Sequence, residues 1–113
     1  MAIFVDARIP VVFAAAAVAG LGDALLIEGE EKAPDWVPVA RFSSAPAAHV
    51  AGCACCVPRG PVAEALRLLF LSRARGTSAF FTRLVVATGE KGETAVRQAL
   101  AGDAFLAGRY RLG

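Results

Sequence analysis

All three cysteines of the chain lie within four consecutive positions, at Cys53, Cys55 and Cys56. Thiolates at positions i, i+2 and i+3 of a tight turn can face one side, and Gly52 just before them lets the backbone bend without a steric penalty. Such a sulfur-rich group suits a soft divalent ion, and zinc is the ion that most often combines sulfur with nitrogen or carboxylate ligands. The spacing therefore predicts a metal site for zinc or another soft divalent metal.

His49 is the only histidine, and it lies four residues before Cys53. We expect this imidazole or a nearby carboxylate to complete the ligand set. Two other interpretations of the cysteines stay open: small apolar side chains packed in a core, and redox chemistry. A disulfide framework does not fit, because the count is odd and neighbouring cysteines cannot reach one another without strain.

The cysteines belong to a segment, residues 43–61, that is rich in Pro, Gly and small residues, as is typical of a functional loop. A short strand is expected before it at residues 37–42, where Pro38 favours an edge position. An amphipathic helix is expected after it at residues 62–75, begun by Pro61 and ended by Gly76.

The remaining apolar segments alternate in character. The pattern predicts strands at residues 9–13 and 80–88, a helix at 14–27, an exposed connection at 28–38, a turn at 89–92, and helices at 94–100 and 104–110. Strands that alternate with helices indicate βαβ units, so we expect an α/β fold with a mainly parallel sheet.

The length of 113 residues allows one domain. The net charge of +2 is too small to favour nucleic acid, although residues 1–57 carry a net −3 and residues 58–113 a net +5. The apolar run at residues 9–27 is interrupted by Asp23 and is too rich in Ala and Gly for a membrane span. We therefore expect a cytoplasmic protein without nucleic-acid or membrane partners.

Several motifs resemble those of the CobW-like GTPases, relatives of the UreG and HypB metallochaperones. Residues 49–56 read HVAGCACC and precede Arg59-Gly60 and the expected helix, which is similar to the G-C-x-C-C motif and following helix of that family. Residues 96–112, with Thr88-Gly89 before them, are similar to a later segment of the family. The resemblance implies a partial P-loop-NTPase-like (Rossmann-like) layered sheet with flanking helices, as a single truncated domain over residues 1–113, and a metal site at Cys53, Cys55, Cys56 and His49.

The family's phosphate-binding loop corresponds to residues 10–26, and here its interior is replaced. The loop glycines correspond to Ala16, Ala19 and Leu21, the lysine to Gly22 and the magnesium-binding threonine to Asp23. Alanine side chains obstruct the backbone N–H groups that wrap phosphates, and an aspartate repels triphosphate. The resemblance therefore predicts a relative that binds metal without GTPase activity and without GTP.

Three functions follow as hypotheses. The first is a metal-binding protein related to metallochaperones that does not act as an enzyme. The second is an interaction or oligomerisation module that pairs with a second copy or another protein through an exposed sheet edge, since unpaired edges invite pairing. The third is a residual GTP-binding protein.

Overall fold

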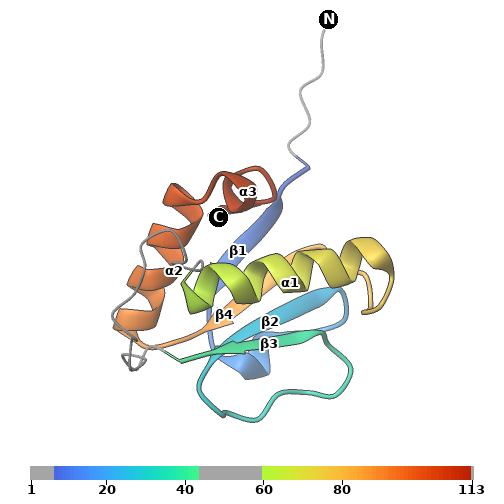
Figure 1. Cartoon of the computed structure of the whole chain (residues 1–113). Coiled ribbons are helices and arrows are strands. Elements are labelled where there is room, and N and C mark those ends of the chain that lie inside the picture. The colour runs from blue at the N-terminus through green and yellow to red at the C-terminus, as the bar shows by residue number, and fades with distance from the viewer. Residues whose placement is uncertain (1–6, 44–59, 113) are drawn as a thin grey trace, which may run out of the picture.

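A parallel sheet of five strands forms the centre of the part of the chain that this computed structural model describes, residues 7–43 and 60–112 (Figure 1). The strands are β1 (Ile9–Phe13), β2 (Asp23–Glu28), β3 (Val39–Phe42), β4 (Arg83–Ala87) and β5 (Tyr110–Leu112), in the spatial order β3-β2-β4-β1-β5. Every neighbouring pair is parallel. The predicted α/β fold with a Rossmann-like layered sheet is confirmed.

The predicted helix over residues 14–27 is wrong. Only a single 3-10 turn, η1 (Ala16–Val18), forms there, and the second half of the segment is β2. The residues from Asp23 to Ile27 are all buried, because β2 lies between β3 and β4 and has both faces covered. A strand buried on both faces reads as a continuous apolar run, which periodicity cannot distinguish from a buried helix. Gly22, with φ 86°, provides the left-handed turn that leads into this strand.

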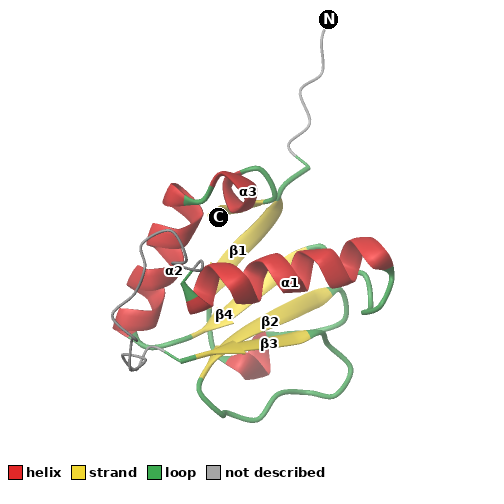
Figure 2. Cartoon of the chain, in the orientation of Figure 1, coloured by secondary structure: helices red, strands yellow, loops and turns green. Residues whose placement is uncertain are grey.

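Helix α1 (Pro61–Arg75) agrees with its prediction at both ends. Pro61 occupies the first turn, where its missing N–H costs no hydrogen bond, and Gly76 ends the helix in the left-handed conformation with φ 73°. Its N-terminus lies at the carboxyl ends of the strands, and its C-terminus leads back to the start of β4 (Figure 2).

The C-terminal helices differ from their predictions in length. Helix α2 (Glu90–Gly102) includes most of the expected turn at residues 89–92, because Gly92 is accommodated inside the helix. Helix α3 (Ala104–Ala107) is one turn long, capped by the Asp103 carboxylate, which accepts hydrogen bonds from Phe105 N and Leu106 N. Strand β5 takes the place of the end of the last predicted helix.

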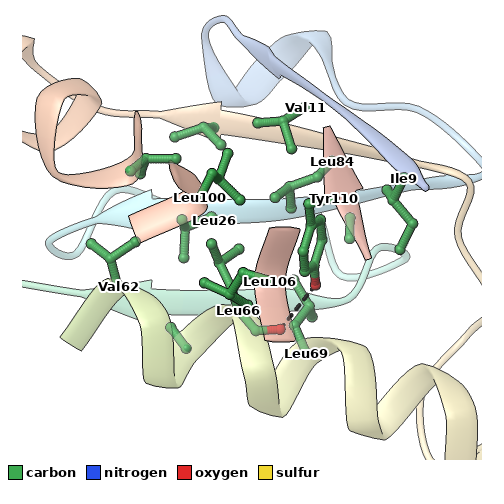
Figure 3. Packing of buried hydrophobic residues seen from close by; sticks show 14 of the residues in the cluster. Ile9, Val11, Leu26, Val62, Leu66, Leu69, Leu84, Leu100, Leu106 and Tyr110 are labelled. Atoms are coloured by element: carbon green, nitrogen blue, oxygen red, sulfur yellow. Dashed lines mark hydrogen bonds between the residues drawn. The ribbon is translucent and has the colours of Figure 1, made fainter. Parts of the chain in front are cut away.

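The three α-helices cover one face of the sheet, where the larger hydrophobic cluster lies (Figure 3). Leu66 of α1 packs there with Leu26 and Leu84 from the sheet, and the Tyr110 hydroxyl donates to Leu66 O at 2.9 Å. The other face carries a smaller cluster, covered by η1 and the β2–β3 connection, whose buried members are Ala16, Ala19, Leu25, Ile27, Val37 and Val85.

The strand order accounts for this division. The crossovers from β3 to β4 and from β4 to β5 step toward the β5 edge, whereas those from β1 to β2 and from β2 to β3 step toward the β3 edge. Because crossovers between parallel strands are right-handed, steps in opposite directions pass over opposite faces. The edge position that Pro38 predicts for β3 is confirmed. Within residues 7–43 and 60–112, no helix is long and apolar enough to cross a membrane.

Candidate functional site

A cleft of about 480 Å³ opens at the carboxyl ends of β1, β2 and β4. The chain leaves β4 over the helical face of the sheet, and it leaves β1 and β2 over the opposite face. A crevice between strands whose connections diverge in this way is the usual ligand position in open parallel sheets. The lining residues are Phe13, Ala14, Ala15, Glu28, Glu31, Val86, Ala87, Thr88, Gly89 and Glu93.

One part of the lining is apolar. It includes the Phe13 ring, and Val86 and Ala87 from the end of β4. The Arg97 guanidinium lies 4.7 Å from the centroid of the Phe13 ring, and Arg97 Nε lies 3.1 Å from Glu93 Oε2. The Arg97–Glu93 ion pair therefore lies beside the Phe13 ring, and of its two members Glu93 lines the cleft.

Glu28 has a fixed position in the lining. Its Oε1 accepts a hydrogen bond of 3.0 Å from the Gly89 N–H, at the beginning of α2. A Cβ atom on Gly92 would lie 2.6 Å from the same Oε1 and 2.8 Å from the Cβ of Thr88. The carboxylate and the helix thus pack so closely that only glycine fits at position 92, and the helix N-terminus further stabilises the negative charge.

Three carboxylates, those of Glu28, Glu31 and Glu93, line the cleft together. Arg41 lies beside this group, where its NH1 donates to Gly29 O at 3.1 Å and Glu31 O at 2.7 Å. Those two bonds fix the β2–β3 connection through its backbone oxygens. The cleft is therefore suited to a cationic group that also presents an apolar surface.

The predicted metal ligands Cys53, Cys55, Cys56 and His49 lie outside the described residues. The described chain stops at Ser43, just after β3, and resumes at Gly60, just before α1. Both of these positions are at the carboxyl edge of the sheet, which also holds the cleft. Within residues 7–43 and 60–112, no group of three or more His, Cys, Asp or Glu side chains is arranged to hold a metal ion.

Residues 10–26 were predicted to correspond to a phosphate-binding loop, and Phe13, Ala14 and Ala15 of that segment line the cleft, whereas the positions predicted to match the loop's glycines and threonine lie elsewhere. Ala16 and Ala19 are buried in the smaller hydrophobic cluster, and Leu21 is 88% exposed. Asp23 starts β2 at the amino edge of the sheet, at the opposite end of the strands from the cleft. The predicted repulsion between Asp23 and a triphosphate therefore does not apply in the cleft.

Asp23 instead forms a two-point ion pair. Arg83 Nε and NH2 donate to its Oδ1 and Oδ2 at 2.9 Å and 2.7 Å, and the Gly20 N–H donates to Oδ2 at 2.9 Å. The hydrogen bond from Arg83 lowers the pKa of the Asp23 carboxyl, although burial opposes this. The pair joins β2 to β4, whose residues 23 and 83 are direct neighbours, and its role is structural.

The cleft carboxylates were not predicted from the sequence, because Glu28 and Glu31 were expected in an exposed connection. One signal was present: Glu28 directly follows the buried run DALLI, and Thr88-Gly89 directly follows LVVA. In a parallel sheet such positions meet at one edge. That signal is usable only when 23–28 is recognised as a strand.

No protein-family model, curated protein or solved structure matches the chain. The similarity to CobW-like GTPases stays a prediction, based on the motif residues in the sequence.

Proposed function

We propose that this chain binds zinc or another soft divalent metal ion through Cys53, Cys55 and Cys56, with His49 or a carboxylate as a further ligand. Zinc with three thiolates and one nitrogen or oxygen donor forms a tetrahedral site. We place the protein in the cytoplasm, where reducing conditions keep such thiols available for metal. The proposed role is that of a metallochaperone relative that stores, delivers or senses metal and is not itself an enzyme.

The observation that carries the proposal is the concentration of every thiol of the chain within four positions. The fold supports the proposal through the positions of the two described residues next to the cysteine segment, one after β3 and one before α1. Ser43 and Gly60 flank it at the carboxyl edge, where parallel α/β folds usually bind ligands. Glu28 and Glu31 lie at the same edge, and they are the described carboxylates that the ligand set could recruit.

Nucleotide binding is not part of the proposal. The connection after β1 holds a 3-10 turn of three residues and then a strand, whereas a phosphate-binding loop leads into a full helix N-terminus. The cleft at the strand ends is lined by three carboxylates, which would repel a triphosphate. Both features favour a metal-binding relative over a residual GTP-binding protein.

Metal content tests the proposal directly. Protein purified under reducing conditions without chelator is analysed by inductively coupled plasma mass spectrometry, and we expect about one zinc per chain. The triple variant C53S/C55S/C56S should contain none, while its far-ultraviolet circular dichroism stays that of the wild type. No metal in the wild type after reconstitution with zinc, or an unchanged affinity in the triple variant, would contradict the proposal.

The fourth ligand is identified by competition with a zinc chelator. His49→Ala should weaken zinc binding at least about tenfold if the imidazole is a ligand. Glu31→Gln should do so if a cleft carboxylate takes that place, and Glu30→Gln is the matched control, because Glu30 does not line the cleft.

A second candidate is an interaction module, and the open edge of the sheet favours it. Among the residues that the structure describes, strand β3 pairs with β2 alone, and Trp36 shortly before it is 64% exposed. An unpaired edge beside an exposed aromatic side chain is a feature of strand-pairing surfaces. Sedimentation of the wild type is compared with that of Val39→Pro. A wild type that sediments as a monomer, as the variant does, would exclude this candidate.

A further inference from the structure

An exposed aromatic side chain projects from the amino edge of the sheet. Phe80, in the connection between α1 and β4, is 65% exposed. The Arg73 guanidinium lies 4.0 Å from the centroid of its ring, and Arg73 Nε donates to Phe81 O at 2.8 Å. Phe81 itself is fully buried, so it anchors the connection. The result is a projection that carries a positive charge on an apolar base, here called the Arg73–Phe80 knob.

The surface around the knob is also basic. Arg109 lies 4.4 Å from the centroid of the Phe105 ring and 5.6 Å from that of Phe70, and Arg73 lies 5.8 Å from the centroid of the same Phe70 ring. In the described ranges, 7–43 and 60–112, neither Arg73 nor Arg109 forms an ion pair with a carboxylate. A guanidinium group beside an aromatic ring can still donate its outer N–H groups to a partner's carboxylates.

The cleft is complementary to the Arg73–Phe80 knob in charge and in apolar surface. It combines an apolar part, Phe13 and Val86, with the carboxylates of Glu28, Glu31 and Glu93, and its volume of about 480 Å³ lies in the range of ligand-binding cavities. Knob and cleft lie at opposite ends of the same strand: the chain passes Phe80 just before β4, and the cleft is lined by residues at the end of β4. The knob therefore cannot reach the cleft of its own chain.

We infer that the cleft receives the Arg73–Phe80 knob of a second copy of this chain. The occupant is favoured by charge complementarity, since a cation with an apolar base meets a carboxylate-lined cavity with an apolar part. A contact between two different surfaces of the same molecule is heterologous, so it builds head-to-tail chains or closed rings. No cysteine or histidine takes part in this assembly, and what it shares with the proposed metal site is the pair of cleft carboxylates Glu28 and Glu31.

Sedimentation velocity tests the inference on the full chain, with reducing agent and chelator present so that metal ions cannot bridge copies. Up to about 1 mM protein at low salt, we expect the weight-average sedimentation coefficient to rise with concentration, and to fall again when salt is added. A wild type that sediments as a monomer over this whole range would overturn the inference.

Two variants each remove one side of the contact. Phe80→Asp places a carboxylate in the knob, and Glu31→Lys places a cation in the cleft. We expect each to weaken association at least about tenfold. Matched controls are Leu68→Asp, which makes the same kind of change at an exposed apolar residue midway along α1, and Glu30→Lys, which makes the same charge change next to the cleft. Both controls should associate within about threefold of the wild type.

Mixing the two variants gives the decisive result. The intact knob of Glu31→Lys can still enter the intact cleft of Phe80→Asp, so an equimolar mixture should form dimers and nothing larger. Pairing of β3 edges does not predict this outcome, because such a contact is isologous and both variants would dimerise alone. Variants that associate as the wild type does, or a mixture that stays monomeric, would overturn the inference.

Discussion

Single residues decide how closely the strand ends and helix α2 pack against one another at the cleft. Gly92 is the clearest case, because Glu28 Oε1 and Thr88 Cβ occupy the space that any side chain at this position would need. The glycine is therefore required by packing inside a helix, where alanine would otherwise be preferred.

We expect Gly92→Ala to lower the free energy of unfolding by about 1–2 kcal/mol, since the cost of overpacking exceeds the gain in helix propensity. Gly102→Ala is the control in the same helix, because nothing lies within 4 Å of its added Cβ, and it should be neutral or slightly stabilising. Urea denaturation measures both. Gly92→Ala should lower the free energy of unfolding less when Glu28 is also replaced, as in the double variant G92A/E28A. An equally large loss in that background would mean that Glu28 is not the obstructing group.

The Asp23–Arg83 pair predicts a pH dependence. Its folded-state carboxyl has a lowered pKa, so between the folded and unfolded pKa values the unfolded state binds more protons and stability rises with pH. The contribution is complete above the ordinary pKa of about 3.9 and is lost as the pH falls through the folded-state value. Asp23→Asn should cost about 1.5–3 kcal/mol at neutral pH and less in acid.

Urea denaturation at neutral pH and near pH 3 measures the difference between Asp23→Asn and the wild type. Asp35→Asn makes the same change at an exposed position and should have no such effect. A difference between Asp23→Asn and the wild type that stays constant with pH would show that the carboxylate charge is not what stabilises the pair.

At the scale of elements, one hydrogen bond joins the last strand to the first α-helix. The buried Tyr110 hydroxyl donates to Leu66 O, and burial raises the pKa of this phenol. We expect Tyr110→Phe to cost about 1 kcal/mol, because it removes the bond while it keeps the edge contact with the Phe70 ring. Thermal unfolding followed by calorimetry measures the loss, and an unchanged midpoint would show that the β5–α1 contact rests on ring packing alone.

The sequence predicted those elements that carry strong end signals. Helix α1 has Pro61 at its start and Gly76 at its end, and both its bounds were predictable. Strand β2 was not, because Ala24, Leu25 and Leu26 are fully buried from both faces and show neither alternation nor helical spacing. Strand β5 is only three residues long, and it exists because β1 offers it a partner, which no local pattern reveals.

The same distinction applies to the candidate site. The cysteine motif is local in the sequence and could be predicted from it. The cleft is instead assembled from three strand ends and the start of α2, and its lining residues Phe13 and Glu93 are 80 positions apart. Tertiary structure alone brings such residues together. A misassigned β2 was therefore enough to hide Glu28 and Glu31 from the sequence analysis.

For the whole molecule, we expect the sheet and its helices to fold without metal. The two hydrophobic clusters draw their described members from residues 9–42 and 62–110, on both sides of the cysteine segment. Addition of a chelator should therefore leave the far-ultraviolet circular dichroism unchanged. Zinc should raise the melting temperature only by the amount that its binding to the folded state contributes. Loss of helical signal on chelation would show that metal and fold are coupled.

The parallel arrangement of the strands has a consequence for the electric field of the protein. Because every strand points the same way, α1 and α2 both begin at the carboxyl edge, where Glu64, Glu90 and Glu93 occupy their first turns. Arg73 and Arg75 occupy the last turn of α1 at the amino edge. These side chains compensate the helix termini locally, and they place acidic groups at the carboxyl edge and basic groups at the amino edge of the described part. In solution the protein should turn its arginine end toward any negatively charged surface before contact is made.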